Sequence, residues 1–172
     1  MWVGSMGILQ LDIVVRGLPS HASQPWYGVN AFEDGVRIAH ALINDLKPRI
    51  EDRQFLGERA AITLGGFVGG GYSRNIVPNY FQFSIDRRIL PNEDLETVHN
   101  ELINYINTLR DGVKSAIDIY IVNRVEPALN NKSDLLGKLM NSIDHVLHVN
   151  PRVGISRFPL ILDTFKGPVW MH

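Results

Sequence analysis

Alternating apolar and polar residues mark the first regular segment of the chain, ILQLDIVVR at residues 8–16. A period of two residues is typical of a strand with one buried face. The apolar side of this strand carries Leu9, Leu11, Ile13 and Val15, and the other side carries Gln10, Asp12, Val14 and Arg16. Three further strands are predicted at residues 60–70, which run into glycines, and at residues 79–89 and 116–122, which alternate again.

Two segments have a helical period instead. Between Asn30 and Leu46, and again after Asn92, apolar residues recur at spacings of three and four, with acidic residues in the first turn. Asn92 is the expected N-cap of the second helix. Pro48 is expected to end the first helix, and residues 47–59 to form a solvated loop. The expected apolar stripes are Phe32, Val36, Ala39, Ile43 and Leu46 in the first helix, and Leu95, Val98, Leu102, Ile106 and Leu109 in the second.

The order strand, helix, strand, strand, helix, strand predicts an α+β fold of the ferredoxin-like β-α-β-β-α-β type. We expect a four-stranded antiparallel sheet with two helices on one face, since each helix has one apolar stripe. The other face carries Gln10, Gln82 and Ser84, which suit solvent or a partner. An additional amphipathic helix is predicted at residues 133–149, followed by an irregular segment. The expected division is a compact unit at residues 7–128 and an appendage at residues 129–172.

Composition places the chain among globular proteins and excludes several classes. Of its 172 residues, 45% are hydrophobic and 20% charged, and the net charge of −1 gives no electrostatic case for nucleic acid or an anionic membrane. No apolar run reaches the roughly 18 residues that a membrane span needs. The start lacks a basic segment typical of a secretory signal. The absence of cysteine fits a cytoplasmic protein.

The candidate chemistry begins with two negative results. The glycines of LGGFVGGGYSRN, residues 64–75, match neither phosphate-loop spacing, and the predicted element after them is a strand and not a helix. His145 and His148 are three residues apart, but no third ligand completes a recognisable metal pattern, so a surface pair is the favoured interpretation. We therefore predict no metal site in this chain.

His21, Asn75 and Arg88 stand out from the other polar residues. His21 lies between serines in GLPSHASQPWYGVNAF, residues 17–32, although a lone histidine in a loop is more often structural than catalytic. Asn75 follows the glycines. Arg88 lies on the polar face of its strand, where it forms either a weak ion pair with Asp86 or a fork for a carboxylate ligand.

Together, GLPSHASQPWYGVNA, GGFVGGGYSRNIVPNYFQFSIDRRILPNE and VEPAL resemble the zinc amidohydrolase and peptidase family of acetylornithine deacetylase, succinyl-diaminopimelate desuccinylase and the glutamate carboxypeptidases. The resemblance covers about residues 7–130, which correspond to the family's lid, or dimerisation, domain. It implies that two lids form a homodimer through a sheet edge and a helix. It also implies that His21 binds the oxyanion in the partner's active site, while Asn75 and Arg88 contact the substrate's carboxylate end.

The resemblance further implies that a complete member binds two zinc ions, but the family's main metal ligands precede the lid and are absent from this sequence. Only His172 weakly echoes the last ligand. We therefore expect this chain to need a catalytic domain or a full-length relative as partner, and to hydrolyse no N-acyl amino acid or peptide alone. Two alternatives remain open: a non-catalytic regulatory or ligand-binding module, and a free-standing enzyme that uses His145 and His148.

Overall fold

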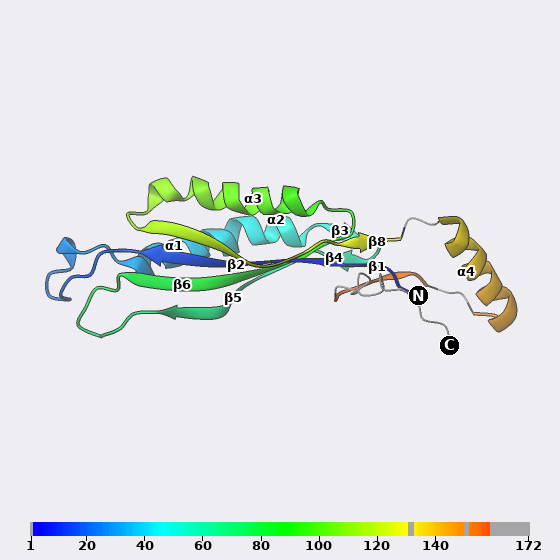
Figure 1. Cartoon of the computed structure of the whole chain (residues 1–172), viewed down its shortest axis with the longest axis horizontal. Coiled ribbons are helices and arrows are strands. Elements are labelled where there is room, and N and C mark those ends of the chain that lie inside the picture. Colours follow the sequence, from blue (N-terminus) through cyan, green and yellow to red (C-terminus); the bar gives the residue numbers. More distant parts are fainter. Residues whose placement is uncertain (1, 131–132, 150–151, 159–172) are drawn as a thin grey trace, which may run out of the picture.

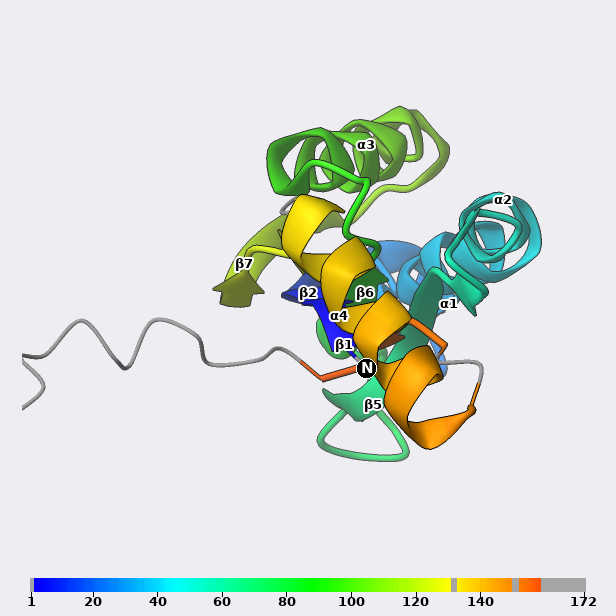
Figure 2. The same cartoon turned by 90° about the vertical axis from the view of Figure 1, so that its right-hand side faces the viewer.

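The computed structural model describes residues 2–130, 133–149 and 152–158. Its main feature is a four-stranded antiparallel sheet in the order β5-β6-β2-β7 (Figure 1). The strands of this sheet are β2 (Gly7–Arg16), β5 (Ala61–Gly70), β6 (Tyr80–Ile89) and β7 (Ala116–Val125). Apart from a separate helix near the C-terminus, the helices lie on one face of the sheet (Figure 2), which confirms the predicted ferredoxin-like arrangement.

The helical layer consists of three regular helices and two irregular segments. The helices are α1 (Ala31–Ala41), α2 (Lys47–Glu51) and α3 (Leu95–Thr108), with a π-helical turn η2 (Leu42–Leu46) between α1 and α2 and a short 3₁₀ turn η3 (Arg110–Gly112) after α3. Asn30 caps α1 through its side chain, as its type favours. Asp94 caps α3 by accepting a hydrogen bond from the Thr97 amide, so the predicted cap at Asn92 is wrong by two residues.

The prediction that Pro48 ends the first helix is wrong. The chain continues from α1 through the π-helical turn into α2, in which Pro48 lies in the first turn. Proline is tolerated there because its missing N–H would have no partner inside the helix. The predicted loop at 47–59 is instead α2 and a small hairpin of β3 (Gln54–Phe55) and β4 (Glu58–Arg59).

The core between the sheet and the helices is built from the predicted strand faces. Leu9, Leu11, Ile13 and Val15 are fully buried, and Leu95, Val98, Leu102 and Ile106 of α3 pack in the same cluster. The stripe expected on the first helix is only partly correct. The buried core residues of α1, η2 and α2 are Ala31, Ile38, Leu42, Leu46 and Ile50, and the predicted Ala39 packs against them, whereas Phe32, Val36 and Ile43 are exposed. The first helix therefore has two apolar faces, one in the core and one facing outward.

Asp34 joins α1 to the start of β7 and is itself buried. Its Oδ2 accepts hydrogen bonds from the amides of Lys114 and Ser115, at 3.1 and 2.9 Å, and from the Ser115 hydroxyl at 2.7 Å. Burial by itself would raise the pKa of Asp34, but the hydrogen bonds from Ser115 and Lys114 outweigh it and hold the pKa below its ordinary value. The carboxylate is therefore the form that the fold stabilises.

We expect Asp34→Asn to lower the free energy of unfolding at pH 7 by about 1–3 kcal/mol, because the amide is a weaker acceptor for three donors, of which the two of Ser115 are buried. The wild-type advantage is complete above the unfolded-state pKa of about 4 and disappears as pH falls through the lower folded-state pKa. Urea unfolding of both proteins from pH 7 to pH 2.5 measures this. A difference that does not change with pH would contradict it.

A second, smaller sheet and a separate helix lie at one end of the main sheet (Figure 1). The sheet has the order β8-β1-β9, with β1 antiparallel to β8 and parallel to β9. The elements are β1 (Trp2–Ser5), β8 (Ala128–Leu129), α4 (Ser133–Leu147) and β9 (Gly154–Ser156). No described helix is long and apolar enough to cross a membrane.

Candidate functional site

His21 lies in the connection between β2 and α1, which includes a short 3₁₀ turn at Pro25–Tyr27. This connection is paired with the segment that follows β5. His21 and Ile76 form an antiparallel bridge, the Ala22 amide donates to the Asn75 carbonyl at 2.8 Å, and the Val77 amide donates to the Ser20 carbonyl at 2.8 Å. Backbone pairing thus holds the histidine at the end of the sheet.

The hydrogen bonds around the His21 ring fix its tautomer. Nδ1 lies 3.2 Å from the Ser23 amide, which donates to it, and 2.7 Å from the Ser23 hydroxyl. A nitrogen that accepts from a backbone N–H carries no proton, so the proton of neutral imidazole is on Nε2. The side chain is exposed. Within the described residues, all hydrogen bonds of the ring use Nδ1, which leaves Nε2–H as an outward donor.

Asn75 lies beside His21 and is also exposed. Its Oδ1 accepts a hydrogen bond from the Ser73 hydroxyl at 2.5 Å, which leaves the side-chain NH₂ to face solvent. The same end of the sheet carries Trp26 and Tyr72, which are 70% and 79% exposed. Sequence reasoning missed these two aromatic residues, and an isolated aromatic in a turn gives no periodic signal that could have found them.

Arg88 lies near the opposite end of the sheet, opposite Ile8 of β2 and Ala61 of β5. Its Nε and Nη2 donate to the two carboxylate oxygens of Asp86 at 2.6 and 3.1 Å, and Asp86 also accepts from Gln10 at 2.7 Å. The predicted same-face ion pair is therefore present. These hydrogen bonds hold the guanidinium of Arg88 in place. Its Nη1 makes no hydrogen bond with another described residue.

The structure separates the three predicted site residues. Both loops that hold His21 and Asn75 lie at the start of β6, next to Tyr80, whereas Arg88 lies at its end (Figure 1). Tyr80 and Arg88 are eight residues apart on one extended strand, a span of about 26 Å. One small ligand therefore cannot contact all three residues within a single copy of the chain.

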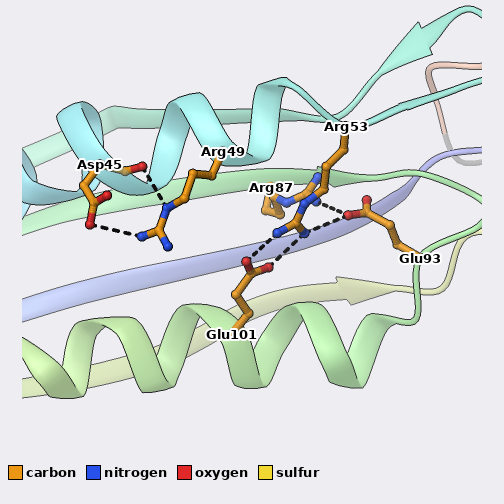
Figure 3. A network of polar contacts seen from close by, with 6 residues as sticks. All are labelled: Asp45, Arg49, Arg53, Arg87, Glu93 and Glu101. Carbon is orange, nitrogen blue, oxygen red and sulfur yellow. Dashed lines mark hydrogen bonds and ion pairs between the residues drawn. The ribbon is translucent and has the colours of Figure 1, made fainter.

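Arg87, the neighbour of Arg88 on β6, belongs to a charge network with Arg53, Glu93 and Glu101 (Figure 3). Alternation along the strand turns Arg87 inward, and its side chain is completely buried. It donates to Glu93 at 2.6 Å and, through Nη1, to the carbonyl of Arg88. Burial lowers the pKa of Arg87, and Glu93 opposes that effect. The network thus fixes the backbone that carries Arg88.

Arg53 joins this network to the helices. It donates to Glu101 of α3 at 2.9 and 2.5 Å and to Glu93 at 3.1 Å, and the hydrogen bonds to Glu101 raise the pKa of Arg53. Glu93 also accepts from the Leu90 amide at 2.8 Å. A more exposed pair, Asp45 and Arg49, lies on the π-helical turn and α2, which precede Arg53 in the chain (Figure 3). Sequence alternation could have indicated the inward position of Arg87, but not its partners.

No described residues form a group of three or more histidine, aspartate or glutamate side chains that could hold a metal ion. His145 lies in the last turn of α4, and His148 follows that helix with a positive φ of 51°. His172 lies outside the described residues. The described residues therefore give no metal centre to which a reaction step could be assigned.

Comparisons with known proteins agree with the fold. Residues 3–113 match the family model of the peptidase dimerisation domain. An uncharacterized metallohydrolase of Methanocaldococcus jannaschii is 25% identical over 158 residues, which are 85% of this chain and 38% of the relative.

Solved structures show the same likeness. A tripeptidase of Staphylococcus aureus is 18% identical with a TM-score of 0.66, over 90% of this chain and 39% of the enzyme. A hydantoinase/carbamoylase family amidase of Burkholderia multivorans is 17% identical with a TM-score of 0.66, over 91% of this chain and 36% of the amidase. The chain thus spans less than two fifths of the length of these relatives.

Proposed function

The chain belongs to the peptidase dimerisation domain family, and from this membership we propose that it is the lid of a zinc-dependent amidohydrolase or peptidase acting on N-acyl amino acids or peptides. The catalytic part would be a separate domain of a longer, cytoplasmic protein. Among the relatives, the metallohydrolase of M. jannaschii supports metal dependence. The two zinc ions would bind in that other domain, where they would activate water and polarise the scissile carbonyl.

The observation that carries the proposal is the separation of His21 and Asn75 from Arg88. When two copies pair antiparallel through an edge strand, the His21 end of one sheet lies beside the Arg88 end of the other. Two mixed sites result, each with His21 and Asn75 from one copy and Arg88 from the other. In each site, Nε2–H of His21 would donate to the developing oxyanion, and Asn75 and Arg88 would bind the carboxylate end of the substrate.

We propose that the paired edge is β5 together with the outer face of α1. Among the described strands none pairs with the outer side of β5, and Val68 of β5 is exposed, as are Phe32 and Val36 of α1. Phe32 and Val68 line a hollow of about 330 Å³, in which Phe32 packs edge-to-face on Phe81 at 5.4 Å between ring centroids. An apolar helix face beside an open strand edge is suited to a second copy of itself. The loop that holds Asn75 also continues directly from this strand.

The proposed boundary between lid and catalytic domain lies near residue 128, so that residues 7–128 form the lid. β1 pairs in parallel with β9, the strand that follows α4 in the chain. This pairing supports a separate unit outside the main sheet. Exposed apolar residues of this part, Leu139, Val146 and Leu147, support packing against further residues of a longer protein.

Substituting one edge valine tests the proposed dimer. We expect Val68→Lys to weaken self-association on the order of 10–100-fold, because a charge in the centre of the interface would be desolvated. The matched control is Val122→Lys on the other edge strand, β7, where the valine is 60% exposed compared with 57% for Val68. Sedimentation velocity over a concentration series measures both variants and the wild-type chain.

We expect a wild-type dimer that Val122→Lys preserves. A wild-type chain that stays monomeric at millimolar concentration would overturn the dimer. Loss of the dimer in Val122→Lys alone would move the interface to β7.

A further inference from the structure

A cavity of about 520 Å³ lies beside Arg88, within the size range of small-molecule sites. Segments far apart in the sequence form it: the β1–β2 connection, the β3–β4 hairpin, the first residue of β5, the end of β6 and the residues that follow β9. Its lining residues are Met6, Gly57, Glu58, Arg59, Ala61, Arg88, Arg157 and Phe158.

Three guanidinium groups and a single carboxylate line this cavity, which is an excess of two positive charges in a chain whose net charge is −1. Asp86 is not part of the lining, but its ion pair with Arg88 reduces this excess to one positive charge. Concentrated positive charge in a concave surface attracts anions more strongly than the same charge spread over a convex one. The cavity therefore favours an acidic ligand.

Two of the arginines are already positioned by carboxylates. Arg157 donates through Nε and Nη2 to the two oxygens of Glu58, at 2.8 and 3.3 Å, as Arg88 does to Asp86. In each pair, Nη1 of the arginine makes no hydrogen bond with another described residue. The side chain of Arg59 makes no hydrogen bond or ion pair with any other described residue, although its backbone belongs to the β3–β4 hairpin. Donors are therefore available from three arginines of the lining, and Met6, Ala61 and Phe158 add apolar surface to the same cavity.

We infer that this cavity binds a small ligand with two carboxylate groups, one held by Arg88 and the other by Arg59 and Arg157. The inference rests on the proposed function for Arg88 and adds the second acidic group, which that function does not require. Planar guanidinium forks match carboxylates in geometry as well as in charge, so a dicarboxylate is preferred to a compact dianion.

Titrating the 172-residue chain with succinate, propionate and inorganic phosphate, followed by ¹H–¹⁵N NMR including arginine Nε–H signals, tests this inference. We expect succinate to bind about tenfold more tightly than propionate, which corresponds to one added charge-assisted contact. Arg59→Gln should reduce succinate binding to the propionate level and leave propionate binding unchanged. Arg88→Gln should remove both, and Arg110→Gln, an exposed arginine outside the cavity, should change neither.

The outcomes separate the two proposals. If Arg59→Gln and Arg157→Gln both keep the preference for succinate while Arg88→Gln removes binding, the second carboxylate site is wrong and the proposed function stands. If Arg88→Gln leaves propionate binding intact, the proposed role of Arg88 itself fails. Phosphate binding as tight as succinate binding, or no binding of any probe, would overturn the dicarboxylate inference.

Discussion

In the proposed full-length hydrolase, mixing two impaired variants, His21→Ala and Arg88→Ala, is expected to restore about one quarter of the wild-type rate at substrate concentrations far below the KM of Arg88→Ala. This holds if protomers exchange freely, because half the dimers are then mixed and each has one intact site. That intact site takes His21 from the Arg88→Ala protomer and Arg88 from the His21→Ala protomer. The physical reason is that His21 and Arg88 of one copy lie at opposite ends of the sheet, too far apart to share one site. Initial rates after co-refolding measure the effect.

Each variant alone sets the baseline. We expect His21→Ala to lower kcat on the order of 10²–10³-fold with a small change in KM, as loss of one oxyanion donor does. Arg88→Ala should mainly raise KM, because it removes a contact made in the ground state as well as in the transition state. A mixture no more active than its components would show that both residues serve the same copy, and the shared-site proposal would then be wrong.

The second large effect concerns the charge network of Figure 3. Glu93→Ala is expected to lower the free energy of unfolding by about 3–5 kcal/mol, because it leaves the completely buried guanidinium of Arg87 without its carboxylate. The double variant Arg87→Met, Glu93→Gln should recover most of this loss, since it removes the buried charge and keeps an acceptor for the Leu90 amide. Urea unfolding of the three proteins gives the energies.

The control for this prediction is Arg49→Ala. The Arg49–Asp45 pair lies in the same figure but is more than half exposed on both sides, so its loss should cost less than about 1 kcal/mol. Equal effects of Glu93→Ala and Arg49→Ala would contradict the assigned role of burial. If the double variant is no more stable than Glu93→Ala, the network stabilises the fold by more than neutralising the buried charge of Arg87.

The alternation of residues 8–16 was sufficient to predict both the strand and its buried face, because a half-buried strand imposes that period directly. The first helix was predicted less well. Its outer residues Phe32 and Val36 have the same spacing as core residues, and no local pattern distinguishes an apolar face that packs inside from one that faces outward. The continuation through Pro48 was missed because a π-helical turn has no clear sequence signal.

The sequence by itself determined the order of the elements, the ferredoxin-like fold and the three residues His21, Asn75 and Arg88 as candidates. These depend on residue type, period and motif spacing, which are local properties of a chain. Only the tertiary structure decided that His21 and Asn75 lie together, that Arg88 lies at the far end, and that Arg59 and Arg157 share its cavity. Such distances follow from strand direction, register and chain reversal, because these bring together residues that are up to a hundred positions apart in the sequence.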